Sequence, residues 1–183
     1  GDNKVEMKKA QEKLCLSCHM DNKDVRERTT PSAGFIHAYD KSVHGYALNI
    51  KNNGEAAGCT DCHTSHSIIK GSDFRSSVFK LNIPNTCGKC HSEIQKEFSE
   101  SIHGQLVAKG NGDAPSCTNC HGEHNILNIK DPNAPVAFQN VSSQVCSPCH
   151  ESMKLSEKYG LAANRYKTFS TSYHGLALSG GSA

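Results

Sequence analysis

The sequence predicts a mainly α-helical fold with a high loop content and almost no β-structure. Charged and apolar residues recur at helical spacing in three segments, residues 4–14, 92–108 and 151–160. Runs with the alternating pattern of a strand are almost absent. Stretches rich in Asn, Gly and Pro predict loops at residues 51–58, 110–115 and 130–135. We therefore expect short helices joined by long connections.

The chain is poor in the apolar residues that normally build a protein core. Its 183 residues correspond to one domain by size. It contains no Trp, hydrophobic residues make up 36% of the chain, and the mean hydropathy is -0.57. A core made of these side chains alone would be small, so another apolar group is expected to contribute to it.

All ten cysteines fall into five copies of one pattern, Cys-x-x-Cys-His, with none left over. This pattern is typical of haem c attachment. Two thiols at this spacing can add to the two vinyl groups of one porphyrin, which places the next side chain beneath the iron as the proximal ligand. The thioether residues are then Cys15, Cys18, Cys59, Cys62, Cys87, Cys90, Cys117, Cys120, Cys146 and Cys149. The proximal ligands are His19, His63, His91, His121 and His150.

Other interpretations of the cysteines are weaker. A single Cys-x-x-Cys could be half of a zinc ribbon, a thioredoxin-like redox pair or part of a disulfide. Neither a zinc nor a disulfide framework explains a His directly after every second cysteine, so the five copies favour haem. Five haem c groups would also supply the missing apolar area. The sequence thus predicts short helices wrapped around a core of five covalently bound haems, and an apoprotein that is largely unfolded.

An internal repeat organises the chain. The segment Ser42-Val-His-Gly45 recurs as Ser101-Ile-His-Gly104, and residues 59–66 recur as residues 117–124. Each repeat holds two Cys-x-x-Cys-His motifs. We expect one pentahaem domain over residues 1–183, with two-haem repeats at about 42–100 and 101–171 and partial units at 1–41 and 172–183.

The repeat also sorts the histidines. Eleven are present, and six remain after the five proximal ligands. Five of the six occupy repeated positions and are the predicted distal ligands: His44, His66, His103, His124 and His174. The alternative is that these five only pack against haem edges. His37 is the odd one out, and is either a surface or packing residue or an extra ligand, including one for a neighbouring molecule.

The sequence allows one assignment of distal ligands that respects the repeat. His66 and His124 lie too close to the proximal His of their own motif to reach over the same ring, so each should ligate a neighbouring haem. The assignment gives His44 to the second haem, His66 to the first, His103 to the fourth, His124 to the third and His174 to the fifth.

These features resemble the doubled-CXXCH multihaem cytochromes of anaerobic respiratory bacteria. The resemblance rests on the paired motifs, on the SxHG segment about fifteen residues ahead of CTxCHxxH, and on residues 82–91, and it extends from Lys13 onward. It implies closely spaced haems with two His ligands each. It also implies electron transfer between a membrane quinol-oxidising module, other periplasmic cytochromes and terminal acceptors, including metals outside the cell.

The expected compartment is periplasmic or otherwise extracytoplasmic. Bacteria and archaea attach haem to Cys-x-x-Cys-His outside the cytoplasmic membrane, whereas residues 1–4 do not form a signal region and no apolar run is long enough to span a membrane. A signal peptide or a membrane anchor would therefore lie in a segment absent from this chain. The spacing of the repeat also predicts another haem motif near position 188, so the chain is expected to be the leading part of a longer cytochrome.

The charge excludes nucleic acid as an expected partner. The polypeptide carries a formal net charge of +2, with its basic residues scattered. Five ferric haems, each with about +1 at iron and about −2 from its propionates, would bring the protein to about −3. Other redox proteins are the expected partners, and self-association is a further option.

Four functions compete at this point. The first is an electron carrier or relay, which is not an enzyme and needs no open iron. The second is a multihaem reductase, which needs one iron with a free position, and the number of His residues argues against it. The third is a subunit of a haem filament, in which the surplus His37 would be donated across the interface. The last is a haem-based redox or gas sensor, which needs an exchangeable ligand.

Overall fold

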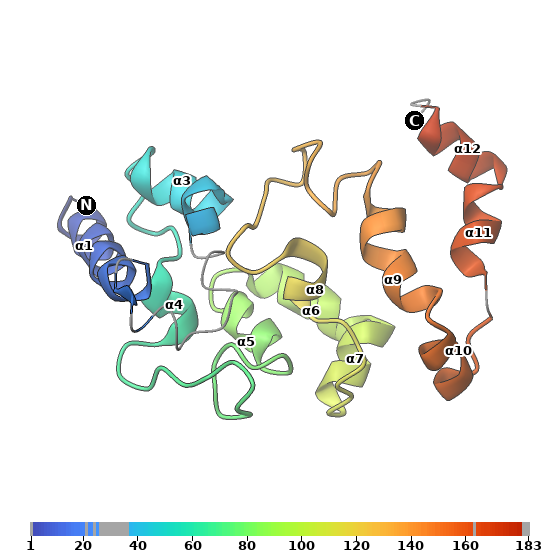
Figure 1. The fold of residues 1–183 in the computed structure, drawn as a ribbon, viewed down its shortest axis with the longest axis horizontal. Coiled ribbons are helices and arrows are strands. Elements are labelled where there is room, and N and C mark those ends of the chain that lie inside the picture. Colours follow the sequence, from blue (N-terminus) through green and yellow to red (C-terminus); the bar gives the residue numbers. More distant parts are fainter. Residues whose placement is uncertain (1, 21, 24, 26–36, 163, 181–183) are drawn as a thin grey trace. The chain divides into compact units, whose positions relative to one another are not determined.

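The computed structural model describes residues 2–20, 22–23, 25, 37–162 and 164–180. The chain falls into two compact units, an N-terminal unit, Gly1–Ile126, and a C-terminal unit, Leu127–Ala183. Helices and turns make up the described part of both, and no strand occurs there (Figure 1). The predicted mainly α fold with a high loop content is therefore confirmed. That both units form one pentahaem domain stays a prediction.

The helices are short, as expected. Those of the N-terminal unit are α1 (Asp2–His19), α3 (Val43–Asn49), α4 (Cys59–His63), α5 (Ile83–Gly88), α6 (Ser92–Glu100), α7 (Ile102–Ala108) and α8 (Cys117–His121). Those of the C-terminal unit are the π-helix η2 (Val141–Cys146) and the helices α9 (Ser147–His150), α10 (Met153–Tyr159), α11 (Arg165–Ser170) and α12 (Tyr173–Ser179). None of the described helices is both long enough and apolar enough to cross a membrane.

Two of the three predicted helices differ from the observed ones in their bounds. The helix expected at residues 4–14 continues to His19 and so includes the first haem motif. The helix expected at 92–108 is two helices, α6 and α7, which meet at Ser101. There the backbone is extended (φ -73°, ψ 159°), and the Ser101 hydroxyl accepts a hydrogen bond from the Gly104 N–H at 3.1 Å. This N-cap ends one helix and starts the next.

The three SxHG segments share this N-cap. Ser42 and Ser172 also accept from the N–H three residues on, at 3.0 and 3.2 Å. Each serine hydroxyl donates in turn to the carbonyl three residues before it, at 2.6 Å. The glycine is required because of this tight turn. A Cβ at Gly45 would overlap the Tyr39 carbonyl oxygen, and one at Gly104 would overlap that of Phe98.

The internal repeat is also present in the turns that follow two of the haem motifs. In residues 70–82 and 128–140, every third N–H donates to the carbonyl three residues before it, at 2.7 to 3.1 Å. The side-chain amide of a closing Asn binds two carbonyls of each ladder: Asn82 binds those of Phe74 and Ser76, and Asn140 binds those of Pro132 and Ala134. Each of these series of turns connects one motif to the next.

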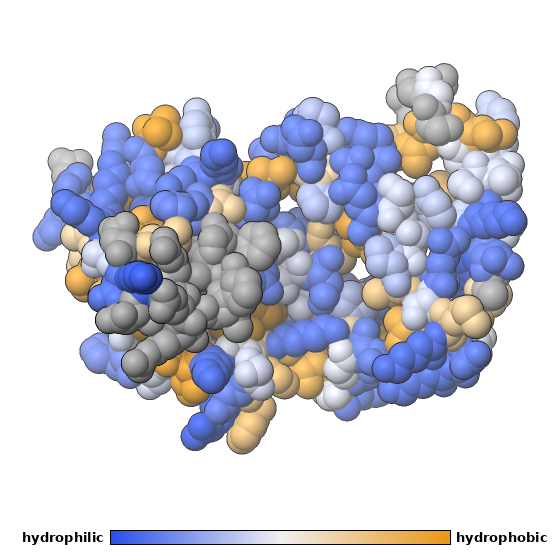
Figure 2. Space-filling model, viewed as in Figure 1, coloured by the Kyte–Doolittle hydropathy of each residue, from blue (hydrophilic) through white to orange (hydrophobic). Residues whose placement is uncertain are grey.

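The protein core is small. The buried hydrophobic residues among those described are Val5, Leu48, Ala56, Ile83, Val107, Ala114, Ala134 and Ala137. Large apolar side chains lie outside instead, including Leu14 (69% exposed) and Phe74 (72% exposed). Apolar side chains are accordingly scattered among polar ones on the face seen in Figure 2. This matches the expectation that side chains alone cannot build the core.

We expect the glycine of the SxHG turn to be essential for stability. Gly45→Ala or Gly104→Ala should lower the free energy of unfolding of the haem-loaded protein by about 1–3 kcal/mol, because the added methyl group overlaps a backbone carbonyl. Gly112→Ala is the matched control, since a Cβ there meets no atom within 4 Å. Urea denaturation followed at the haem absorbance tests this, and equal stability of all three variants would contradict it.

We also expect the polypeptide to need its cofactor in order to fold. The chain without haem should show little of the helical far-UV circular dichroism of the loaded protein, because its own buried apolar area is small. Expression with and without a cytochrome c maturation system provides the two samples. A helical, cooperatively melting apoprotein would show that the side chains suffice.

Candidate functional site

Four of the five Cys-x-x-Cys-His motifs lie in the N-terminal unit. The first ends α1, the second is α4, the third begins in α5 and the fourth is α8. The fifth spans η2 and α9 in the C-terminal unit. No disulfide joins any of the ten motif cysteines in the structure. No group of three or more His, Cys, Asp or Glu residues that could hold a metal ion, as a zinc site requires, occurs among the described residues.

The second and fourth motifs have the same local structure. Each is one short helix whose third residue caps its own start: Asp61 Oδ2 accepts from the Gly58 N–H at 2.8 Å, and Asn119 Oδ1 accepts from the Ser116 N–H at 2.9 Å. Each helix ends at a residue with positive φ, Thr64 (65°) or Gly122 (79°). The chain therefore turns sharply after the proximal His, which leads His66 and His124 away from their own motif.

In the N-terminal unit, a cysteine of each motif lies close to a cysteine of the next motif along the chain. Burial raises the pKa of Cys59, and the nearby Cys15 thiol raises it further. Burial, and then the proximity of Cys87, raises the pKa of Cys62. The interaction of the Cys87 thiol with the neighbouring Cys117 thiol raises the pKa of Cys87 and lowers that of Cys117. These pKa shifts do not apply once the thiols are bound to haem as thioethers, which have no titratable proton. What the contacts indicate for the haem-loaded protein is that the first motif lies near the second, the second near the third, and the third near the fourth.

Two pairs of imidazole rings lie close together in the N-terminal unit. The ring centroids of His63 and His124 are 6.0 Å apart, with 11° between the ring planes. Those of His44 and His91 are 6.2 Å apart, with 44° between the planes. A coordinating imidazole nitrogen lies about 2 Å from its metal, so two imidazoles on opposite sides of one iron have centroids roughly 6 Å apart. The centroid separation in both pairs is therefore similar to that expected for two axial ligands of one iron.

The surroundings favour the form of imidazole that binds iron. Burial lowers the pKa of His63, and the neighbouring His124 lowers it further. Burial also lowers the pKa of His44, with a contribution from His91. The neutral ring that results is the one that ligates a metal. His124 carries a further sign of a missing group, because its Nδ1 is buried without a hydrogen-bond partner.

These pairs differ from the assignment made from the repeat. That assignment placed His44 on the second haem and His124 on the third, whereas in the structure His44 lies near His91 and His124 lies near His63. The structure also contains a long-range contact between these segments that the repeat does not encode. The Val43 N–H donates to the Ile126 carbonyl at 2.8 Å, which joins the start of α3 to the segment after α8.

For the other candidate ligands, the assignment rests on the sequence alone. His66 is exposed and shares a hydrogen bond with the Ser65 hydroxyl at 2.9 Å. His174 is exposed and meets Tyr173 edge to face, with ring centroids 6.0 Å apart. His103 is half-buried, and His37 is exposed. Their roles as distal ligands, or in the case of His37 as an extra ligand, stay predictions.

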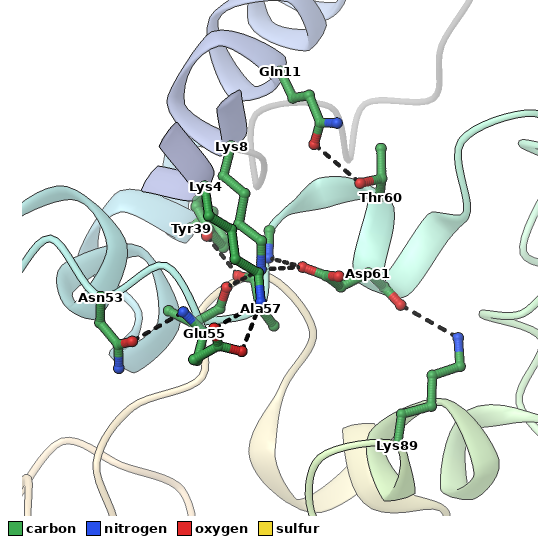
Figure 3. Close-up of polar contacts among 12 residues, drawn as sticks. Lys4, Lys8, Gln11, Tyr39, Asn53, Glu55, Ala57, Thr60, Asp61 and Lys89 are labelled. Carbon is green, nitrogen blue, oxygen red and sulfur yellow. Dashed lines mark hydrogen bonds and ion pairs between the residues drawn. The ribbon is translucent and has the colours of Figure 1, made fainter. Parts of the chain in front are cut away.

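Sequence reasoning missed the polar contacts that dock α1 on α4 (Figure 3). Lys8 Nζ forms an ion pair with Asp61 Oδ2 at 2.8 Å and donates to the Ala56 carbonyl at 2.6 Å. The Thr60 hydroxyl donates to Gln11 Oε1 at 3.0 Å. The only local signal was that Asp61 stands where the repeat has Asn119. The partners are too far apart in sequence for a pattern to join them.

Comparison with known proteins agrees with the motifs. Residues 52–96 match the family model of the doubled CXXCH motif. The matched segment contains the second and third motifs together with the turn ladder that joins them. No curated protein and no solved structure matched the chain. The match confirms the resemblance to the doubled-CXXCH cytochromes, and the motifs indicate haem c binding.

The ring pairs can be tested by removing one haem and one His together. In Cys59→Ser/Cys62→Ser/His124→Ala, the second haem and its distal ligand are both lost, so all remaining ferric haems should be low-spin. In the matched variant Cys59→Ser/Cys62→Ser/His44→Ala, the third haem loses its ligand and one haem should become high-spin. Low-temperature EPR quantifies both spin states. If instead the His124→Ala variant contains a high-spin haem and the His44→Ala variant does not, the result would support the assignment made from the repeat.

Proposed function

Because residues 52–96 carry the doubled CXXCH motif of multihaem c-type cytochromes, we propose that this chain is an electron carrier or relay with one haem c on each of its five motifs. The observation that carries the proposal is the combination of adjacent motif cysteines with two imidazole pairs at the spacing of axial ligands. When bound, haem supplies an iron that accepts and gives up one electron.

In the proposed ligand set, each motif provides its own proximal His. His124 is the distal ligand of the second haem and His44 that of the third. For the other three sites the proposal keeps the assignment from the sequence, with His66 on the first haem, His103 on the fourth and His174 on the fifth. Two strong ligands at every iron leave no position for a substrate, which favours transfer over catalysis.

The residues of the chain have three tasks in this function. The motif cysteines hold each cofactor covalently, and their contacts keep neighbouring sites close. The half-buried histidines stay neutral and fix the axial positions. Burial, and then the charge of His91, lowers the pKa of His121, which supports a fourth site near the third. A row of sites with fixed spacing is what electron transfer without chemistry at the iron requires.

The proposed setting is an extracytoplasmic respiratory chain. Haem c is attached outside the cytoplasmic membrane, and c-type cytochromes are typical of that compartment. Electrons would enter from a membrane quinol-oxidising module and leave to periplasmic or extracellular acceptors. Other redox proteins are the proposed partners, and the charge of the loaded protein, about −3 when oxidised, would favour basic partner surfaces.

The number and spin state of the haems test this function. Mass spectrometry of the purified protein should give the mass of the chain plus five haems, and EPR of the oxidised protein should account for all five as low-spin ferric haem. A stoichiometric high-spin signal would mean that one iron has an open position, and would favour a reductase or a sensor instead. Fewer than five haems would contradict the one-haem-per-motif count.

A further inference from the structure

The second and fourth motifs of the N-terminal unit differ in their charge environment. Within the two motifs the one different residue is Asp61 in place of Asn119. Both side chains accept the hydrogen bond that caps their own helix. The carboxylate of Asp61 has a second task, because it also receives the ammonium group of Lys8. Both motifs therefore have the same helix cap, and the second motif has an ion pair in addition.

The Lys8 side chain is nearly buried and contacts several groups of the neighbouring segment (Figure 3). It is 10% exposed, whereas the Asp61 side chain is 44% exposed. Its ammonium group binds the Asp61 carboxylate and the Ala56 carbonyl, and its aliphatic stem lies against Gly58. The Lys8 bonds oppose the effect of burial on Asp61, so that the pKa of this carboxyl is lower than usual. A lysine with so little solvent contact is retained only when its charge is compensated.

The ion pair belongs to an interface that joins two haem sites. Lys8, Gln11 and Cys15 are spaced three and four residues apart, so they lie on one face of α1. They meet Asp61, Thr60 and Cys59 of α4 in that order. This face thus runs from the ion pair to the contact between a cysteine of the first motif and a cysteine of the second.

We propose that Lys8 and Asp61 are positioning residues that fix the first haem site against the second, and that each of their two charges compensates the effect of the other on the reduction potential of the second site. The inference rests on the proposed electron-transfer function. A carboxylate stabilises the oxidised, more positive state of a nearby haem, and an ammonium group stabilises the reduced state. Paired, the two effects largely cancel at the second site.

The charge role predicts opposite shifts for the two single variants. Asp61→Asn keeps the cap, as Asn119 does, but leaves the Lys8 charge unpaired, so the midpoint potential of the affected haem should rise. Lys8→Met leaves the carboxylate unpaired, so the potential should fall. Each change should be about tenfold in the equilibrium constant for reduction, or about 59 mV for one electron. The double variant should return close to the wild-type potential.

A second ion pair between the same regions serves as the control. Lys4 Nζ lies 2.7 Å from Glu55 Oε2, and these side chains are 47% and 78% exposed. Solvent screens such a pair, so Lys4→Met and Glu55→Gln should change the potentials by less than about twofold in the same equilibrium constant. Lys8→Arg, which keeps the charge, should also change them little.

The test is an optical redox titration of the loaded proteins combined with EPR of the magnetic coupling between neighbouring haems. Opposite shifts in the single variants and recovery in the double variant support the proposal. Shifts of the same sign in both, as a loosened α1 would produce, overturn it, and so does the absence of any shift. If Lys8→Met yields no loaded protein, Asp61→Asn is compared with the double variant, and removal of Lys8 must lower the potential in that background.

Failure of this inference can be distinguished from failure of the proposed function. The function fails if the wild-type protein has an open iron or lacks haems on some motifs. The inference fails if the wild type has five low-spin haems and the charge variants do not shift the potentials in opposite directions. The Asn119→Asp variant adds a further check, since a carboxylate at the fourth motif should lower a potential there.

Discussion

Iron coordination by histidines that are distant in sequence is the constraint on which the N-terminal unit depends in this account. His63 faces His124 and His44 faces His91, so each pair connects segments that are otherwise held by few apolar contacts. The hydrogen bond from the Val43 N–H to the Ile126 carbonyl also joins α3 to the segment after α8. Ligation would thus do for this chain what a hydrophobic core does for most domains.

Local hydrogen bonds, rather than buried apolar contacts, determine much of the backbone conformation. Serine caps start the helices of the SxHG segments, and the adjacent glycine lets the backbone pass close to a carbonyl. Ladders of tight turns, closed by Asn82 and Asn140, replace longer elements between motifs. Such devices satisfy backbone groups locally, which leaves the apolar side chains free to face a cofactor. The docking of α1 through Lys8 and Asp61 is the main exception, as it joins distant segments by charge.

Local patterns determined what could be predicted from the sequence. The fold class, the family resemblance and the position of each motif follow from short spacings that any reader can count. The break at Ser101 was missed because helical periodicity continues across it, although the serine cap was present in the repeat. The pairing of the rings depends on contacts between residues 47 to 83 positions apart, and the Lys8 ion pair joins residues 53 positions apart. A single sequence gives no pattern that encodes such contacts.

A crystal structure of the loaded protein with anomalous scattering at the iron edge would locate each iron independently of the polypeptide and so identify its ligands. We expect one iron between His63 and His124 and a second between His44 and His91. An iron shared by His44 and His63 would contradict it, and would mean that the repeat, rather than the contact between α3 and the segment after α8, decides the ligands.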